Sequence, residues 1–483
     1  MKFRVRFSLC ILAVLAWAAP ALWAQDPSQG SVSDQIQALQ DQNQSLQQRL
    51  QALEDKVNAA PAAQDQSAAS PAGLQDVYTP LDEGSEYINS ESRHFVLSDR
   101  TGKDQLRFGG YLFSELALND QAPGYEPGVN GFLARKAHLD FGGRFDDLVG
   151  MSIGIESDKS TAVSIGFFHA YVYVKFDKAL EFQAGKFTNA LSLEGLQPSA
   201  DLPFVESSML ANLIPDKDIG AMISGEVDHW ADYALEVANG EQDNESSATG
   251  PGKAAQDFKA VTARVFLTPF KHSHDEGLKG LGLGLAGILD NEVNQDNAPW
   301  QKLETSFGGN AFMTYNGSVV ARGDFYHWDA QGYYYNGPFG FLGEYVQSIQ
   351  TVGVPGKPSV QLTNIGWLAE ATFVLGGEAG YEGVKVDQPF DPARGQWGAF
   401  EFAARLHSNL IDVNSFTVGF PYDPLGGSLG QGAEVATAYG LGVNWWLDNH
   451  FKWMIDAERT EFSGGNLAVL PEQAAVVRAT LIL

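Results

Sequence analysis

From about Gln105 to the final residue, apolar and polar side chains alternate in segments of about ten residues, separated by clusters of turn-forming residues. Residues 168–176, 400–406 and 477–483 are the clearest examples, because every second side chain is apolar and most of the others are polar. A period of two is typical of β-strands with one apolar face. Its repetition along the chain indicates a barrel that crosses a membrane with its apolar face outward.

The alternation predicts strands that start near residues 104, 132, 148, 166, 180, 218, 231, 257, 280, 306, 325, 338, 363, 397, 434, 450 and 472. Bacterial single-chain barrels have an even number of strands, so one of these candidates is excessive. The weakest is Ser306–Thr314, which has Gly308 and Gly309 at its centre. We therefore expect an all-β fold, a 16-stranded antiparallel transmembrane β-barrel. The alternative is a secreted β-sandwich, propeller or solenoid.

Short and long connections should lie at opposite ends of such a barrel. Tight turns are expected at residues 146–147, 177–178, 336–338 and 447–449, at the periplasmic end. Long loops, several of them acidic or glycine-rich, are expected at residues 119–131, 240–256, 291–303, 351–358, 383–395 and 421–432, at the outer end. An even strand number also places the N-terminus in the periplasm.

A different period precedes the barrel, since residues 33–58 follow a strict heptad pattern. One core position holds Ile36, Asn43, Leu50 and Val57, and the other holds Leu39, Leu46 and Leu53. This pattern predicts a short coiled coil in which the polar Asn43 fixes register and strand number. A β-branched first position with Leu at the second favours a dimer. The alternative is a solitary amphipathic helix, which would be marginal in water.

The remaining N-terminal segments are a signal and a linker. Residues 1–24 have a basic start, an apolar core at Leu9–Ala19 and small residues at Ala21 and Ala24, as a secretory signal peptide requires. The only cysteine, Cys10, lies within this signal. Residues 59–92 are mostly Ala, Pro, Gln, Ser and Asp, which predicts a flexible linker to a barrel domain at residues 93–483.

The stretch Gly185–Gly220, GKFTNALSLEGLQPSADLPFVESSMLANLIPDKDIG, is far longer than an ordinary connection. It resembles the hallmark region of the phosphate-selective porin O/P family of bacterial outer membranes. YYYNGPFGFLGEYVQ, GWLAEATFVLGGE, QWGAFEFAARL and GLGVNWWLDNHFKWMIDAERTEF also resemble segments of that family. The resemblance implies a homotrimeric porin in the outer membrane of a Gram-negative bacterium, in contact with its lipid. It also implies that the long loop folds into the pore and narrows it.

Charge changes what the resemblance implies about selectivity. Residues 93–483 hold 26 Lys and Arg against 48 Asp and Glu, a balance of −22, which argues against nucleic acid as a partner. The long loop carries Glu194, Asp201 and Glu206 and has no Lys or Arg between residues 188 and 215. Because phosphate-selective members use a basic constriction, this acidic loop favours a weakly cation-preferring or nearly non-selective pore.

Strand alternation also predicts which side chains line the pore. The inward charged and polar candidates are Lys136, His138, Asp140, Arg144, Lys175, Arg264, Glu401, Arg405, Lys452 and Arg478. Their mixed signs are compatible with free groups that set selectivity and, equally, with groups that pair across strands and only keep the wall polar.

No catalytic constellation, nucleotide-binding motif or cofactor site stands out in the sequence. The pair His272 and His274 lacks further ligands at a supporting spacing, so we expect a solvated turn and no metal. We therefore expect a porin for passive diffusion of small hydrophilic solutes or ions. One alternative is a structural protein that tethers the envelope through periplasmic or cell-wall contacts of its coiled coil. The other is a barrel hydrolase, which the absence of a nucleophile motif disfavours.

Overall fold

The computed structural model describes residues 95–100, 103–120, 131–158, 165–240, 259–275, 277–292, 302–417 and 428–483. The predicted signal peptide at residues 1–24, the coiled coil at residues 33–58 and the linker at residues 59–92 lie outside the described residues. None of the helices in the described ranges has the length and apolar character needed to cross a membrane.

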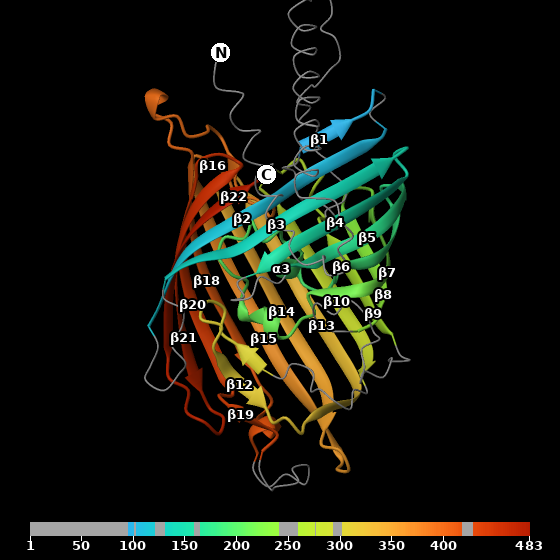
Figure 1. Ribbon diagram of the computed structural model, residues 1–483, viewed down its shortest axis with the longest axis vertical. Coiled ribbons are helices and arrows are strands. Elements are labelled where there is room, and N and C mark those ends of the chain that lie inside the picture. Colours follow the sequence, from blue (N-terminus) through green and yellow to red (C-terminus); the bar gives the residue numbers. More distant parts are fainter. Residues whose placement is uncertain are drawn as a thin grey trace, which may run out of the picture. The chain divides into compact units, whose positions relative to one another are not determined.

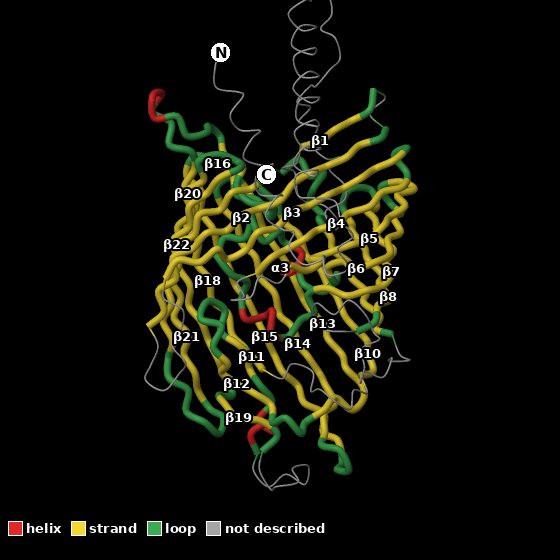
Figure 2. Tube along the Cα trace, viewed as in Figure 1, coloured by secondary structure: helices red, strands yellow, loops and turns green. Residues whose placement is uncertain are grey.

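Sixteen of the described strands form one closed antiparallel sheet (Figures 1 and 2). They are β2 (Gln105–Asp120), β3 (Gly131–Phe145), β4 (Val149–Asp158), β5 (Ile165–Asp177), β6 (Leu180–Thr188), β7 (Lys217–Val227), β8 (Ala231–Ala238), β9 (Ala260–Leu267), β10 (Leu281–Glu292), β13 (Val320–Asn336), β14 (Phe339–Gly353), β15 (Ser359–Leu375), β18 (Ala399–Leu410), β20 (Val435–Trp446), β21 (Phe451–Ser463) and β22 (Glu472–Ile482). Each pairs with the next, and β22 pairs with β2, which closes the barrel. The 16-stranded fold predicted from the alternation is therefore confirmed.

The two faces of each strand differ as the alternation predicts. In β21, the apolar side chains of Trp453 and Ile455 point outward and are 42% and 59% exposed, whereas Lys452 and Asp456 on either side of them are buried in the lumen. Leu283 and Leu441 on other strands are likewise exposed on the outside. Such an apolar outer band is the surface that a bilayer covers.

The strand candidate at residues 306–314 lies outside the barrel wall. Part of it forms β12 (Ala311–Tyr315), which pairs with β11 (Lys302–Glu304) and β19 (Gly430–Gly432) in a separate three-stranded sheet near the lower end of Figure 1. The side chains of Leu303, Phe312 and Met313 are only 1% exposed and join the apolar core inside the barrel. A short 3-10 helix, η4 (Val413–Phe416), contributes to the same core.

Tight turns join strands where they were expected. In the β3–β4 connection, Asp146 and Asp147 have φ values of +52° and +57°, and the N–H of Leu148 donates to the carbonyl of Phe145 over 3.1 Å, which is the pattern of a type I′ turn. At this short-turn end, β1 (Phe95–Ser98) pairs with the part of β2 that extends beyond β22.

The loop at residues 383–395 was assigned to the wrong end. It belongs to the β15–β18 connection, which contains β16 (Gly377–Glu378), β17 (Lys385–Val386) and the 3-10 helix η3 (Pro392–Arg394). The backbone N–H of Ala379 donates to Gly337 in the tight turn before β14, over 2.8 Å. The connection therefore lies at the short-turn end. The prediction relied on the length of this loop. The order of the strands gives the correct end, because β14 begins at a tight turn and the antiparallel β15 therefore finishes at the same end of the barrel.

Candidate functional site

The connection between β6 and β7, residues 189–216, folds into the lumen of the barrel. It contains a helical turn, α3 (Leu193–Leu196), and a 3-10 turn, η2 (Met209–Asn212). Ser192 caps α3 by accepting the N–H of Gly195 at 2.9 Å, and Ser208 caps η2 by accepting the N–H of Leu210 at 3.2 Å. Serine is a preferred residue at both positions because its hydroxyl satisfies a free backbone donor. We call residues 189–216 the inner loop.

Apolar side chains fix one side of the inner loop to the barrel wall. Leu191, Leu193, Met209, Leu210 and Leu213 are at most 1% exposed and belong to the apolar core inside the barrel. Wall residues of the same core include Leu342, Val346 and Leu368, which point inward from β14 and β15. The burial of five large side chains stabilises this placement by about 1.5–3 kcal/mol for each. The lumen is therefore filled on the side of β14 and β15.

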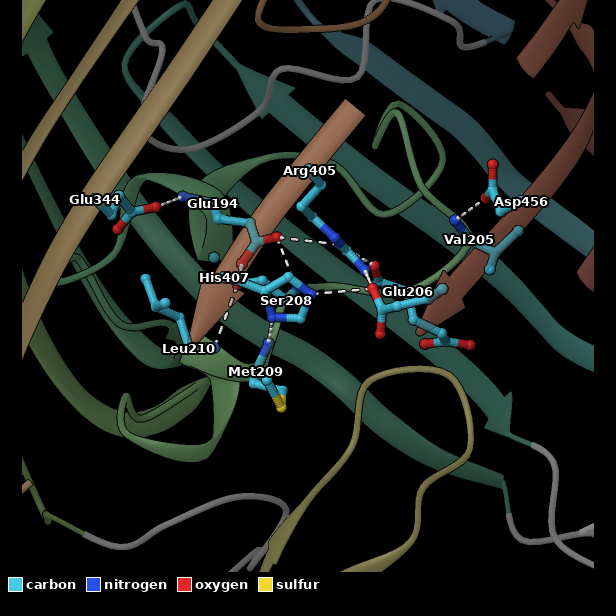
Figure 3. A network of polar contacts seen from close by, with 12 residues as sticks. Glu194, Val205, Glu206, Ser208, Met209, Leu210, Glu344, Arg405, His407 and Asp456 are labelled. Carbon is cyan, nitrogen blue, oxygen red and sulfur yellow. Dashed lines mark hydrogen bonds and ion pairs between the residues drawn. The ribbon is translucent and has the colours of Figure 1, made fainter. Parts of the chain in front are cut away.

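Polar wall residues bind the backbone of the inner loop directly. Lys452 donates to the carbonyl of Leu202 over 2.9 Å, and Arg405 donates to that of Glu206 over 2.8 Å. The side-chain amides of Gln331, Asn444 and Asn409 donate in the same way to the carbonyls of Leu191, Pro203 and Met209. In the opposite direction, the backbone N–H groups of Val205 and Met209 donate to the side chains of Asp456 and His407 (Figure 3). These side chains, which come from four strands, satisfy a backbone that would otherwise be buried without partners.

Glu344 and Glu194 organise the first half of the inner loop. The carboxylate of Glu344 accepts the N–H of Leu193 at 3.0 Å, the Ser192 hydroxyl and the N–H of Glu194. Glu194 in turn accepts the N–H and hydroxyl of Ser208 at 2.8 and 2.6 Å, and its carboxylate lies 3.8 Å from Arg405 (Figure 3). Burial raises the pKa of Glu194, and the charge of Arg405 offsets only part of this effect.

Glu206 holds the second half of the inner loop against two arginines. Its Oε1 atom lies 2.9 Å from Nε of Arg135 and 3.0 Å from Nη2 of Arg478. Burial raises the pKa of Glu206, but Arg478 and Arg135 together outweigh burial and hold that pKa below its usual range. Asp201, the third acidic residue predicted for the constriction, is buried beside Gly383. The predicted carboxyl groups of Glu194, Asp201 and Glu206 are thus engaged by neighbouring residues, and Asp216, at the end of the loop, pairs with Lys217.

The structure places most of the predicted pore-lining residues in the lumen. His138, Asp140, Arg264, Glu401, Arg405, Lys452 and Arg478 are buried there, whereas Lys136, Arg144 and Lys175 are partly exposed. Arg405, Lys452 and Arg478 contact the inner loop, and Arg264 donates to Gln331 beneath it over 2.6 Å. Arg144 and Lys175 do not belong to this group, since Arg144 bridges to Asp147 in the tight turn and Lys175 lies opposite Glu181.

Arg135 was missed in the sequence because a bulge changes the alternation. The register of β2 and β3 shifts between Phe113 and Ser114, so that Arg135 is an extra residue next to Lys136. A bulge of this kind turns two consecutive side chains to one face. Glu344 and Asn444 were also missed, and their inward positions in alternating strands are the signal that identifies them.

An open cavity of about 320 Å³ remains between the inner loop and the wall residues of β2, β3, β5 and β6. Tyr111, Phe168, His169 and Tyr171 line it from the wall. Asn189, Gln197, Ser199 and Ser207 line it from the loop. The loop therefore packs against one side of the lumen and leaves this cavity at the other.

Charged groups at this cavity are paired. Lys136 lies 3.5 Å from Glu156, and Lys217 lies 2.7 Å from Asp216. Asp140 lies 2.9 Å from both His138 and His169. Among the described residues, no group of three His, Cys, Asp or Glu side chains has the geometry of a metal site.

The family model described as phosphate-selective porin O and P matches residues 120–462. No curated protein matches the sequence significantly. Among solved structures, the outer membrane channel DcaP of Acinetobacter baumannii aligns with a TM-score of 0.50 at 9% identity, over 80% of this chain and 99% of that one. The anion-selective porin from Comamonas acidovorans aligns with a TM-score of 0.49 at 10% identity, over 79% and 100%. At such identities the likeness concerns the fold alone.

Proposed function

The chain belongs to the phosphate-selective porin O and P family, and we propose that it passes small hydrophilic solutes or ions across the outer membrane by passive diffusion. The observation that carries this proposal is the open cavity of about 320 Å³ beside the inner loop. The loop narrows the barrel, and the polar side chains of this cavity would line the route of a small solute along the wall of β2, β3, β5 and β6.

We propose that this route has weak selectivity. The acidic groups of the inner loop face Arg135, Arg405 and Arg478, and the charges at the cavity are paired with one another. Paired charges give a small net field, whereas a free ring of one sign would select strongly. The excess of acidic residues elsewhere in the barrel then concentrates cations near the mouth within about 8 Å at physiological salt. A nearly non-selective or weakly cation-preferring pore follows.

Recording from the purified protein in planar bilayers tests this function. We expect discrete conductance steps and a small reversal potential in a KCl gradient, of the sign given by cation preference. Strong anion selectivity, with current blocked by millimolar phosphate, would refute the weak selectivity while leaving the channel function intact. The absence of conductance steps from correctly folded protein would refute the channel function itself.

We propose further that three copies assemble, with residues 33–58 as a periplasmic coiled coil on the trimer axis. This proposal rests on the heptad pattern and on the family resemblance. The same helix makes envelope tethering the second candidate function. Deletion of residues 33–84 separates the two functions, because a tether loses cell-wall co-sedimentation while a porin keeps its conductance.

A further inference from the structure

Ring side chains form a continuous series on the wall of the open cavity. Along β5, the ring centroids of His169 and Tyr171 are 5.6 Å apart, and those of Tyr171 and Tyr173 are 6.4 Å apart. Residues two apart on a strand are separated by about 6.6 Å, so these rings follow the strand. Phe187 meets Tyr171 edge to face at 6.4 Å. We call His169, Tyr171 and Tyr173 the ring ladder.

The ring ladder borders two cavities of the lumen. His169 and Tyr171 line the cavity of about 320 Å³, and Tyr173 lines a much smaller one, of about 20 Å³, towards the short-turn end. Asp140 contributes to the lining of both cavities, so the three rings follow the wall from the larger cavity towards the smaller one.

Glycines of β4 leave room for the outer two rings of the ladder. A Cβ atom at Gly150 would lie 2.1 Å from the Tyr173 ring, and one at Gly154 would lie 2.7 Å from the His169 ring. Both rings therefore lie over the backbone of the neighbouring strand, where any larger residue would displace them. A ring that rests on the wall in this way can present a face to the lumen.

The side of the cavity that faces the rings presents polar as well as apolar groups. Ser199 and Ser207 contribute hydroxyls from the inner loop, and Gln197 contributes an amide, beside apolar residues such as Leu196 and Ile214. The ammonium of Lys217, which also lines the cavity, contacts Asp216 and lies 3.5 Å from the centroid of the Phe168 ring. The cavity thus joins ring faces on one side to hydrogen-bonding groups on the other.

We propose that the ring ladder is a binding track for cyclic polyols of monosaccharide size; the inference rests on the channel function proposed above. A sugar ring has C–H groups on its faces and hydroxyls around its rim. The faces of aromatic rings carry partial negative charge and attract such C–H groups, while the rim can bond with Ser199 and Ser207. A cavity of about 320 Å³ is at the lower end of the range for small-molecule sites.

Sugar block of the ion current in planar bilayers tests the proposal with the full-length protein. We expect glucose to reduce the current of the wild-type channel at millimolar concentration. Sorbitol, an acyclic polyol of nearly the same size, should do so at least several-fold more weakly, because it has no flat face. Tyr171→Leu and Tyr173→Leu should each weaken glucose block about three- to tenfold, as expected for the loss of one ring contact.

Tyr439→Leu is the matched control, since Tyr439 lies on the lipid face of β20 and is 50% exposed. It should leave both conductance and glucose block unchanged. Equal block by glucose and sorbitol, or unchanged glucose block in a conducting Tyr171→Leu or Tyr173→Leu channel, would overturn the proposal. Conductance without any sugar block refutes the track alone, whereas the absence of conductance refutes the channel function on which it rests.

Discussion

Arg135 and Glu206 meet inside the barrel, with Nε of the arginine 2.9 Å from Oε1 of the glutamate. The arginine is available only because of the bulge in β3, and the glutamate lies on the inner loop. Arg478 approaches the same oxygen from β22 at 3.0 Å. One loop carboxylate therefore contacts two wall cations, which links the position of the loop to the charge of the pore.

Replacement of this carboxylate by an amide should change selectivity. Glu206→Gln leaves Arg135 and Arg478 with one fewer negative partner, so the reversal potential in a KCl gradient should shift towards anions. The loss of charged hydrogen bonds should also destabilise the docked loop by about 1–3 kcal/mol. Glu461→Gln is the control, because Glu461 pairs with Arg459 at 3.0 Å and both side chains are 50% exposed. A reversal potential equal to that of the wild type would contradict the prediction.

The ionisation of Glu206 should also set the lower limit of the pH range in which the inner loop stays docked. The pKa of Glu206 is depressed in the folded state, so its contribution to stability is fully present above the unfolded-state pKa of about 4.3. This contribution is lost as the pH falls through the folded-state pKa. Open-channel noise should therefore stay constant from about pH 8 to pH 5 and rise below about pH 4. Glu206→Gln should lack this acid transition, and its persistence in that variant would assign it to another group.

Glu344 should control the order of the first half of the inner loop. Glu344→Gln replaces an anionic acceptor of three hydrogen bonds with a neutral amide that offers one acceptor oxygen. We expect a loss of about 1–3 kcal/mol, seen as faster proteolysis near residues 192–196 and more current noise. Glu378→Gln, which removes an exposed pair with Lys385 at 3.2 Å, should have little effect. Equal proteolysis of the two variants would exclude Glu344 as the anchor.

Tyr381 should hold the inner loop from the short-turn end. Its hydroxyl donates to the carbonyl of Leu193 over 2.5 Å, and its ring stacks on Tyr333 at 5.5 Å. Tyr381→Phe keeps the ring and removes only the hydrogen bond, so it should cost about 0.5–1.5 kcal/mol. Thermal unfolding followed by circular dichroism measures this loss, with Tyr345→Phe on the outer face as the control. An unchanged midpoint would show that the hydroxyl contributes nothing net.

Asn43 provides a test of the proposed trimer. A polar core residue fixes register at a cost in stability, so Asn43→Leu should strengthen the association of a peptide of residues 33–58 while loosening its specificity. Crosslinking of the variant should then give mixed oligomers, whereas the wild-type peptide should give trimers. A clean trimer from both peptides would remove Asn43 from this role.

The number of strands was predictable because every barrel strand shows the same alternation of apolar and polar residues. The even number of strands in bacterial barrels then excludes one of the seventeen candidates. The inward positions of Arg405, Lys452 and Arg478 followed from the same alternation. The partners of these three residues could not be predicted. Alternation shows on which face of the sheet a side chain lies, but it does not show which loop residues contact that side chain. Glu206 and Arg478 are 272 positions apart in the chain, and their contact depends on the closed barrel.

Irregular backbone explains the remaining differences. Arg135 is the extra residue of a bulge, so it faces inward together with Lys136, although strict alternation assigns it to the outer face. The connection at residues 376–398 was placed by its length, although its position after β15 determines its end of the barrel. Both errors arose because a local feature of the sequence, the alternation in one case and the loop length in the other, was interpreted without the pairing and order of the neighbouring strands.

Arg478 lies at the seam between the last strand and the first. Its guanidinium contacts Glu115 of β2 and Glu206 of the inner loop, although β2 and β22 lie at opposite ends of the barrel sequence. The loop also depends on β14, β18 and β21, all of which follow it in the chain. The contacts that hold the inner loop are therefore complete only once β22 has paired with β2, so the docking of this loop is tied to the closure of the barrel.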